Sequence, residues 1–370
     1  MRINQSRVLV TLAALAIVVA ACGSSSSSDK AKTAKSAADM GGMDALVTAA
    51  KAEGKLNVIA LPPDWANYGQ MIKDFQTKYG ITITSDNPDG SSADEVNAVK
   101  NLKGTDKAPD VLDLGVNVAL QNTDLFAPYQ VAAWSDIPAN LKESTGLWVS
   151  DYAGYESIGC DASKVPPPAK MSDLKDPKYK GMVALNGDPT QASAGFHGVV
   201  MAALANGGSA DDLSAGVKFF KDLSDAGILL PVDPNPATIK SGQTPCVIDW
   251  LYNNRAQTDA LKGTIDFQVT IPSDSPPVAA YYIQAINKDA PHPAAARLWE
   301  EYLYSVDGQN TWLKGYAVPV LFDKMKADGT IDKAALAALP TTSQPAVVLT
   351  QDQLTKGQDY LKSNWTITIK

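Results

Sequence analysis

Residues 56–84 read LNVIALPPDWANYGQMIKDFQTKYGITIT and indicate the class of fold. The apolar run 56–61 is typical of a buried strand, and the polar and aromatic residues 62–69 are typical of a loop. Apolar residues at helical spacing between Met71 and Tyr79 predict a helix that ends at Gly80, and 81–84 predict a second strand. A strand, a helix and a strand in this order form a βαβ unit, which favours a mostly parallel sheet covered by helices.

The same alternation continues on both sides of this unit. A helix is expected from Met43 to Glu53, where Gly54 would end it, and residues 134–160 are expected to be extended chain. We therefore predict an α/β fold whose sheets are mostly parallel and flanked by helices. Its further strands are predicted at 111–114, 182–185, 245–248, 265–271 and 278–287, and its further helices from Ser91 onward, over 194–205, over 210–226 and over 293–303.

The composition is typical of a soluble globular protein with more than one core. A chain of 370 residues is longer than one hydrophobic core usually serves, so two lobes are expected. Hydrophobic residues make up 45% and charged residues 19% of the chain. The net charge of −8 becomes −10 if Arg2 and Arg7 are removed with a signal. Such a charge offers no footprint for nucleic acid and no basic patch for a membrane surface.

The first residues have the pattern of a secretion signal. Arg2 and Arg7 precede an apolar run over 8–21, which is shorter than the ~20 residues of a stable membrane span. Small residues then lead into a cysteine in Val19–Gly23, which resembles the lipobox of bacterial lipoproteins and predicts a lipid on Cys22. We therefore expect a signal peptide over 1–22, a flexible serine-rich tether over 23–42, and an extracytoplasmic body anchored to the cell membrane. An ordinary signal whose cysteine stands there by chance is the alternative.

Two further cysteines, Cys160 and Cys246, remain after Cys22 is assigned to the lipid. In an oxidising compartment an isolated pair favours a disulfide. Two buried thiols are the alternative, because free cysteine packs well as a small apolar residue.

Patterns for catalysis are weak, so we predict no enzymatic activity, no cofactor and no metal. The two histidines, His197 and His292, lie far apart and lack a cysteine or acid at metal-ligand spacing. Residues 172–175 match the S-x-x-K pattern of penicillin-binding enzymes, but this short pattern is expected by chance and no KTG element accompanies it. An extracytoplasmic enzyme remains the competing class.

Polar and aromatic residues gather instead where strands end, which is where open α/β sheets bind ligands. Serines at a predicted helix start could meet a ligand through free backbone N–H groups. Each residue also has an ordinary structural interpretation, because helix caps and buried aromatics are common. The candidate ligand-binding residues are Asp64, Trp65, Ser91, Ser92, Asn117, Tyr155, Asp188, Thr190, Trp250, Tyr252, Tyr281 and Tyr282.

The order and spacing of several stretches resemble a known family. They are 56–69, 89–95, 108–111, 180–189, 241–244, 293–308 and 315–319. Together they resemble the lipid-anchored, extracytoplasmic solute-binding proteins of ABC importers, in particular the group for polyamines, ferric iron, thiamine or aminoethylphosphonate. The resemblance implies a two-lobed periplasmic-binding-protein fold of type II, with lobe 1 at 43–149 and 276–315 and lobe 2 at 150–275 and 316–370. It implies hinge crossings at Tyr152–Gly159 and Val278–Asn287, with Cys160 and Cys246 in one lobe.

The resemblance also implies a function and partners. A monomer would capture a small solute between the lobes and deliver it to a membrane permease. Trp250 stands where relatives often place a stacking aromatic, and Ser91 and Ser92 stand where many place hydroxyl ligands. The adjacent tyrosines of ferric-iron relatives and the return-strand aspartate of polyamine relatives are missing here. Acids and aromatics with little arginine favour a cationic amine, whose charge the rings of Trp65, Trp250 and Tyr281 could face. An anionic phosphonate is the alternative.

Overall fold

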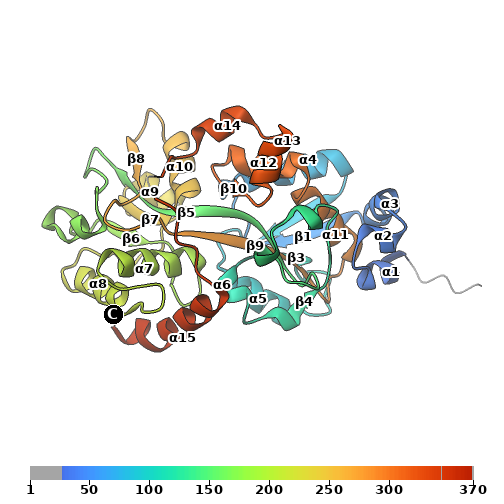
Figure 1. Ribbon diagram of the computed structural model, residues 1–370, viewed down its shortest axis with the longest axis horizontal. Helices are drawn as coiled ribbons and strands as arrows, with labels where there is room; N and C mark the ends of the chain where they lie inside the picture. The colour runs from blue at the N-terminus through green and yellow to red at the C-terminus, as the bar shows by residue number, and fades with distance from the viewer. Residues whose placement is uncertain (1–26, 343, 369–370) are drawn as a thin grey trace, which may run out of the picture.

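The computed structural model describes residues 27–342 and 344–368 as one α/β molecule (Figure 1). The predicted signal peptide over 1–22 and the lipid predicted on Cys22 lie outside the described residues. The strands are β1 (Lys55–Ile59), β2 (Thr82–Asp86), β3 (Val111–Gly115), β4 (Phe126–Ala127), β5 (Val149–Asp161), β6 (Val183–Leu185), β7 (Cys246–Trp250), β8 (Phe267–Thr270), β9 (Ala279–Asn287) and β10 (Val318–Pro319). In the described part of the chain, no helix combines the length and the apolar composition that a bilayer span requires.

The helices cover both ends of the sheet (Figure 1). They are α1 (Ser27–Thr33), α2 (Ala37–Met40), α3 (Met43–Glu53), α4 (Tyr68–Tyr79), α5 (Ser92–Asn101), α6 (Val116–Ala119), α7 (Ser193–Ala205), α8 (Ser214–Asp225), α9 (Pro236–Ser241), α10 (Leu251–Ala260), α11 (Pro293–Leu303), α12 (Val306–Lys314), α13 (Phe322–Asp328), α14 (Lys333–Ala338) and α15 (Gln351–Thr368).

Several helix ends confirm the signals in the sequence. Gly54 ends α3 and Gly80 ends α4, both in the left-handed conformation at φ of 68° and 71°, which glycine adopts without steric cost. Ser91 caps α5 as predicted: its hydroxyl accepts from the Asp94 N–H, and the Asp94 carboxylate accepts from the Ser91 N–H.

Strand pairing is parallel in only part of the structure. β1 pairs with β2, and β6 pairs with β7, in parallel as predicted. The larger sheet has the order β3-β9-β5-β7-β6, and its pairs β3–β9, β9–β5 and β5–β7 are antiparallel. The predicted predominance of parallel pairs is therefore wrong for the pairs that involve β5 and β9. The reason is that these two strands run in opposite directions through the middle of the sheet.

β5 and β9 connect the two halves of the molecule (Figure 1). The first part of β5, Val149–Tyr155, pairs with β9, and its last part pairs with β7 and β8. A third segment crosses beside them, since the Val347 N–H donates to the Pro277 carbonyl and the Val347 carbonyl accepts from the Ala279 N–H. The crossings that the sequence predicted at 152–159 and 278–287 fall within β5 and at β9.

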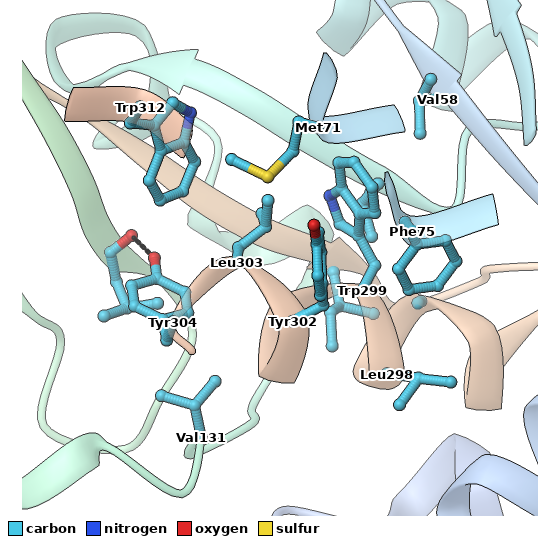
Figure 2. Close-up of a cluster of buried hydrophobic side chains, with 14 of the residues drawn as sticks. Val58, Met71, Phe75, Val131, Leu298, Trp299, Tyr302, Leu303, Tyr304 and Trp312 are labelled. Carbon is cyan, nitrogen blue, oxygen red and sulfur yellow. Dashed lines mark hydrogen bonds between the residues drawn. The ribbon is translucent and has the colours of Figure 1, made fainter. Parts of the chain in front are cut away.

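Each half has its own hydrophobic core. In the first half, Trp299 and Tyr302 of α11 pack on Phe75 of α4, with the Phe75 and Trp299 rings 5.1 Å apart, edge to face (Figure 2). The Tyr304 hydroxyl donates to the Val149 carbonyl at 2.9 Å and ties this core to β5 (Figure 2). In the second half, α7 and α8 pack together, and α15 contributes Leu361 and Trp365 to the same core.

The chain after Gly315 divides between these cores. Residues 316–370 were expected in lobe 2, but Ala317, Leu321 and Met325 are buried in the first core, together with Ala335 of α14. Only the part from Val347 onward packs in the second core. The expected boundary therefore lies too early, because β10 pairs with the first part of β5 and holds the following helices against the first half.

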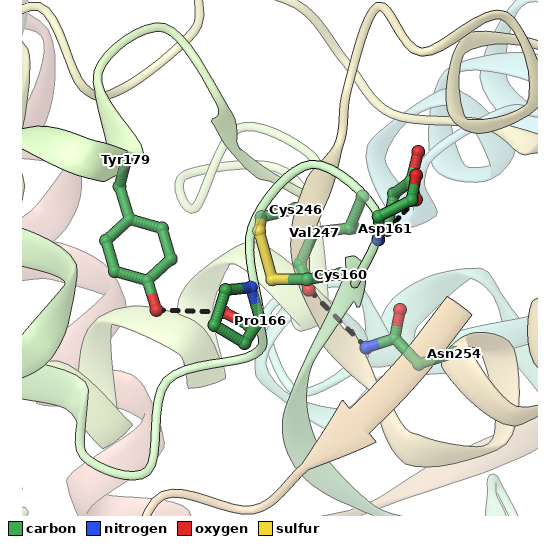
Figure 3. The surroundings of a disulfide bond; sticks show 8 residues. Cys160, Asp161, Pro166, Tyr179, Cys246, Val247 and Asn254 are labelled. Atoms are coloured by element: carbon green, nitrogen blue, oxygen red, sulfur yellow. Dashed lines mark hydrogen bonds between the residues drawn. A yellow bond between two sulfur atoms is a disulfide. The ribbon is translucent and has the colours of Figure 1, made fainter. Parts of the chain in front are cut away.

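The disulfide predicted between Cys160 and Cys246 is present, with an S–S distance of 2.09 Å (Figure 3). The two cysteines stand directly opposite each other on the antiparallel strands β5 and β7. Both are fully buried, so the bond crosslinks the end of β5 to the start of β7 inside the second half.

Residues 27–42 differ from the predicted flexible tether. They form α1 and α2, and Ala31, Ala34 and Met40 of this segment are buried in the first core. Arg297 of α11, itself 1% exposed, holds this segment: its Nε donates to the Ala34 carbonyl at 2.8 Å and its Nη2 to the Lys32 carbonyl at 3.2 Å. The described end of the expected tether is thus part of the folded body.

We expect replacement of Arg297 by alanine to release α1 and α2 from the body. Hydrogen bonds from a charged group contribute about 1.5–3 kcal/mol, and the change also leaves two carbonyl groups of the segment without their donor. Limited proteolysis followed by mass spectrometry should show early cleavage between residues 27 and 42. Lys333→Ala on exposed α14 is the control and should leave the cleavage pattern unchanged. An Arg297→Ala protein with wild-type resistance in this segment would contradict the prediction.

Candidate functional site

A cleft of about 320 Å³ lies between the two halves, near several of the strand ends at which the sequence predicted ligand-binding residues. Its walls come from both halves: the β1–α4 loop, the start of α5 and β3 on one side, and the β6–α7 loop, the turn before α9, the end of β7 and α10 on the other. Its polar lining residues are Asp64, Asp89, Ser91, Ser92, Asp94, Glu95, Asp113, Asn186, Asp188, Gln191, Ser193, Asp233, Asn235, Asp249, Asn253, Asn254, Gln257 and Tyr282, with Trp65 among the apolar ones.

The lining is strongly acidic. Among the described residues that form it, eight carry a carboxyl group and none is lysine, arginine or histidine. Four of these carboxyl groups come from the β1–α4 and β2–α5 loops and the first turn of α5, one comes from β3, and three face them from the second half. A low-dielectric cleft lined by one sign of charge attracts solutes of the opposite sign. The described lining therefore presents acidic groups without a basic partner.

The loop that carries Asp64 and Trp65 has an unusual backbone. Ala60, Ala66 and Asn67 adopt the left-handed region at φ of 54°, 43° and 68°, which is uncommon outside glycine. The Gly69 N–H closes the loop by donating to the Pro63 carbonyl at 2.8 Å, and a Cβ at Gly69 would lie 2.9 Å from that oxygen. Strain of this kind concentrates at ligand sites.

This loop contacts the other half across the cleft. The Gln257 side-chain amide of α10 donates to Asp64 Oδ2 at 2.9 Å. The Trp65 indole N–H donates to the Tyr152 hydroxyl at 2.8 Å, and the Trp65 ring meets the Tyr252 ring edge to face at 5.5 Å. Asp64 and Trp65, both predicted from the sequence, thus line the cleft and connect its walls.

Ser91 and Ser92 also line the cleft, but their hydroxyl groups are engaged within the fold. Ser91 is held in the capping box of α5. The Ser92 hydroxyl accepts from the Gly115 N–H at 3.0 Å, and Ser92 is 6% exposed. The hydroxyl of Ser91 therefore caps α5, and the hydroxyl of Ser92 connects α5 to the end of β3.

Asp188 lines the cleft, whereas Thr190 and Asn117 do not. The Thr190 hydroxyl donates to Asp188 Oδ1 at 2.7 Å, so it stabilises the loop. The Asn117 amide donates to Gln358 of α15 at 2.8 Å, and Gln358 in turn donates to the Thr190 carbonyl. The predicted polar residues Asn117 and Thr190 therefore help to hold the two halves together through α15.

Of the predicted aromatic residues beyond Trp65, only Tyr282 lines the cleft. Trp250 and Tyr252 are fully buried behind it, and the Trp250 indole N–H donates to the Tyr282 hydroxyl at 3.3 Å. Trp250 thus belongs to the core instead of the lining, because it follows the lining residue Asp249 on β7 and successive strand side chains point to opposite faces. Tyr155 and Tyr281 also lie outside the lining, since strand side chains alternate between the faces of a sheet.

Four important lining residues were not among the candidates. Asp113 lies inside the apolar run of β3, where a charged residue is itself a signal. Asp249 is the penultimate residue of β7 and directly follows the strand predicted at 245–248. Asp233 lies in a proline-rich turn and accepts from the Gly187 N–H at 2.8 Å. Gln257 lies in the middle of α10 and reaches the cleft only through the packing of the two halves.

Burial raises the pKa values of three carboxyl groups that line the cleft. Burial raises the pKa of Asp113 to about 7, although a hydrogen bond from Tyr152 lowers it. Burial likewise raises the pKa of Asp249 to about 7 against hydrogen bonds from Asn186, Trp250 and Asn253. Burial also raises the pKa of Asp233, which the Gly187 N–H lowers. A nearby cation would lower the pKa values of these three carboxyl groups, because it stabilises the charged form that burial disfavours.

Within residues 27–342 and 344–368 no group of three or more histidine, cysteine, aspartate or glutamate side chains is placed to hold a metal ion. The tyrosines nearest the cleft are engaged with each other: Tyr152 and Tyr282 stack with ring centres 5.6 Å apart. The described lining thus offers a surface of carboxylates, amides and aromatic rings.

The chain belongs to the family of bacterial extracellular solute-binding proteins, whose model matches residues 107–342, more than half of its length. Proteins of this family bind small solutes and work with ABC transporter permeases. No curated protein sequence matches the chain.

Solved structures of binding proteins share the fold. AgtB from A. tumefaciens R10, in complex with agropinic acid, has a TM-score of 0.66 at 18% identity, over 85% of this chain and 98% of that one. AfuA from Actinobacillus pleuropneumoniae, with fructose-6-phosphate bound, has a TM-score of 0.64 at 16% identity, over 85% and 97%. Iron-bound HitA from Pseudomonas aeruginosa has a TM-score of 0.62 at 18% identity, over 85% and 99%. The expected periplasmic-binding-protein fold is therefore confirmed.

Proposed function

We propose that this protein captures a small cationic solute, an amine or polyamine, in the cleft and delivers it to an ABC permease. The observation that carries the proposal is the lining of eight carboxyl groups without a basic side chain among its described residues. Carboxylates neutralise ammonium groups, and the faces of Trp65 and Tyr282 supply cation–π contacts. No catalytic step is needed for this role.

Binding would act by bringing the two halves together. The ligand would contact Asp64 and Trp65 on one wall and Asp188 and Asp249 on the other. A ligand that makes better contacts in the closed arrangement shifts the equilibrium toward it. The contacts of Asp64 with Gln257 and of Trp65 with Tyr252 support this mechanism, because they join the walls directly.

The anionic alternative has less support. A phosphonate would need free N–H or hydroxyl donors and positive charge, and the serines proposed for it are committed to the start of α5 and to β3. The carboxyl groups around them would repel an anion at short range.

The place of action follows from the family, which is extracytoplasmic. Within this role we assign a lipid to Cys22 as the anchor, with the protein acting as a monomer at the membrane face. A tether raises the effective concentration of a capture protein near its permease.

Thermal unfolding with candidate solutes tests the proposal. Putrescine and spermidine at 100 times their dissociation constant should stabilise the protein by about 2.7 kcal/mol, which is a shift of several degrees in Tm. Aminoethylphosphonate should cause no comparable shift. A shift in Tm with the phosphonate and none with either amine would contradict the proposal of a cationic solute. If none of the three compounds shifts Tm, both the amine and the phosphonate are contradicted, and the family's general role of binding small solutes is what stands.

A further inference from the structure

A pair of buried carboxyl groups lies at the floor of the cleft. Asp113 of β3 lines the cleft and is 5% exposed. Its Oδ2 accepts from the Tyr152 hydroxyl at 2.9 Å, but its Oδ1 is buried and has no hydrogen-bond partner among the described residues. A buried carboxyl oxygen in this state requires either a proton held by the carboxyl groups themselves or a bound partner.

The second member of the pair is Asp151 of β5, which is fully buried. Its Oδ1 accepts from the Tyr152 N–H at 2.6 Å, and its Oδ2 accepts from the Gln284 amide at 2.9 Å. The same amide donates to the Tyr68 hydroxyl at 3.0 Å, and Gln284 stands opposite Asp113 in the β3–β9 register. The two carboxyl groups therefore share one network of phenols and a single amide.

Among the described residues, no positive charge faces this pair. Every titratable group that interacts with Asp113 in the described part of the chain is an acid or a phenol: Tyr68 of α4, Glu95 of α5, Asp151 and Tyr152 of β5, Tyr252 of α10, Tyr282 of β9 and Tyr304 directly after α11. Two buried carboxylates without a counter-ion are strongly disfavoured, so the pair keeps a proton. Burial and then repulsion by Asp113 raise the pKa of Asp151, which agrees with this geometry.

We infer that capture of a cation is coupled to release of a proton from the Asp113–Asp151 pair, an inference that rests on the proposed function. An ammonium group placed against Asp113 supplies the charge that the pair lacks. The proton then leaves the carboxyl group for solvent, and the carboxylate and the ammonium form an ion pair. No covalent bond of the ligand is made or broken. Affinity for the cation therefore rises with pH until the pair is already ionised without ligand.

Isothermal titration calorimetry with putrescine tests this coupling. At each pH from 6 to 9, measurements in two buffers with different ionisation enthalpies give the number of protons released. Primary ammonium groups, like that of lysine, keep their protons over most of this range, so the released proton comes from the protein. Because Asp249 also lines the cleft, the decisive quantity is the difference between wild type and Asp113→Asn. We expect wild type to release about one proton more at pH 6, with this difference falling toward zero at pH 9.

The variants separate this inference from the proposed function. Asp106→Asn changes an exposed carboxyl group outside the lining and should retain the proton release of wild type. Putrescine binding with equal proton release in wild type and Asp113→Asn would overturn the coupling and leave the capture of amines intact. Absence of binding by either amine in wild type, with a folded protein, would overturn the proposed function and the coupling with it.

A second measurement tests the coupling between cation binding and proton release if Asp113→Asn does not fold. Wild-type protein labelled with ¹³C at aspartate carboxyl groups can be titrated by NMR with and without putrescine. We expect carboxyl resonances that titrate near neutral pH in the free protein and no longer do so in the complex. Unchanged titration of these resonances on saturation with putrescine would overturn the coupling.

Discussion

Replacement of Asp110 by alanine is expected to lower the free energy of unfolding by about 3–5 kcal/mol. Asp110 is fully buried where β1, β3 and α11 meet. Its carboxylate accepts from the Asn57 N–H at 2.6 Å, from the His292 N–H at 2.7 Å and from His292 Nδ1 at 2.9 Å. The alanine variant would leave two backbone donors unsatisfied and remove the partner of the imidazole, so each of these losses adds to the cost.

The measurement is chemical denaturation of wild type, Asp110→Ala and Asp106→Ala. Asp106 is an exposed carboxylate four residues away whose side chain makes no hydrogen bond among those described. Its replacement should change stability by about 0.5 kcal/mol or less. Loss of less than about 1 kcal/mol in Asp110→Ala would show that the carboxylate does not hold these elements together.

The same contact gives stability a pH dependence. The hydrogen bond from His292 to Asp110 raises the pKa of His292 above its ordinary value of 6.5. Protonation is therefore more favourable in the folded state, and this contribution is complete below pH 6.5 and lost as the pH rises through the raised pKa. We expect the free energy of unfolding of His292→Gln, measured by chemical denaturation at a series of pH values, to lack the decrease that wild type shows above pH 6.5.

Replacement of Trp65 by alanine is expected to have the largest effect on capture. Trp65 is half-buried, lines the cleft and touches both walls through Tyr152 and Tyr252. Alanine would remove the aromatic face for the ligand and the contact that joins the halves. Central aromatic anchors of this kind contribute about 2–4 kcal/mol, which is roughly 30- to 1,000-fold in the dissociation constant.

Calorimetry with the amine that stabilises wild type measures this loss. Trp65→Phe keeps a ring but loses the indole N–H to Tyr152, so its affinity should lie between those of wild type and Trp65→Ala. Trp134→Ala is the matched control, since Trp134 is also half-buried in the first half but lies outside the lining and faces Lys142. Equal losses in Trp65→Ala and Trp134→Ala would show a general effect on stability and contradict a role in the cleft.

Local patterns predicted most of the regular structure, because they depend on neighbouring residues. Glycines at positive φ and the serine cap of α5 gave the helix ends directly. The helices of 27–40 were missed because this polar segment has no apolar stripe of its own. It is ordered by Arg297, a contact from the far end of the chain that no local pattern reveals.

The sequence predicted the lining residues that directly follow a strand. It did not predict those whose position depends on how strands pair or on how the two halves pack. The strand-end rule found Asp64, Trp65 and Asp188 in the lining. It could not choose between Tyr281 and Tyr282, since neighbouring strand residues face opposite sides and only the register decides which faces the cleft. Asp113 and Gln257 reach the lining through β9 and through the contact of the halves, so their positions required the structure.

The third crossing segment limits how the molecule can move. Two connecting strands alone would allow the halves both to bend and to twist against each other. Here the chain around Val347 is hydrogen-bonded beside the start of β9 and continues into α15, where Gln358 ties α6 to the loop at Thr190. Three hydrogen-bonded segments that cross side by side resist twisting more than bending, so we expect closure to follow one rotational axis. The ligand would then meet the same geometry at each closure, and less orientational entropy would be lost on capture.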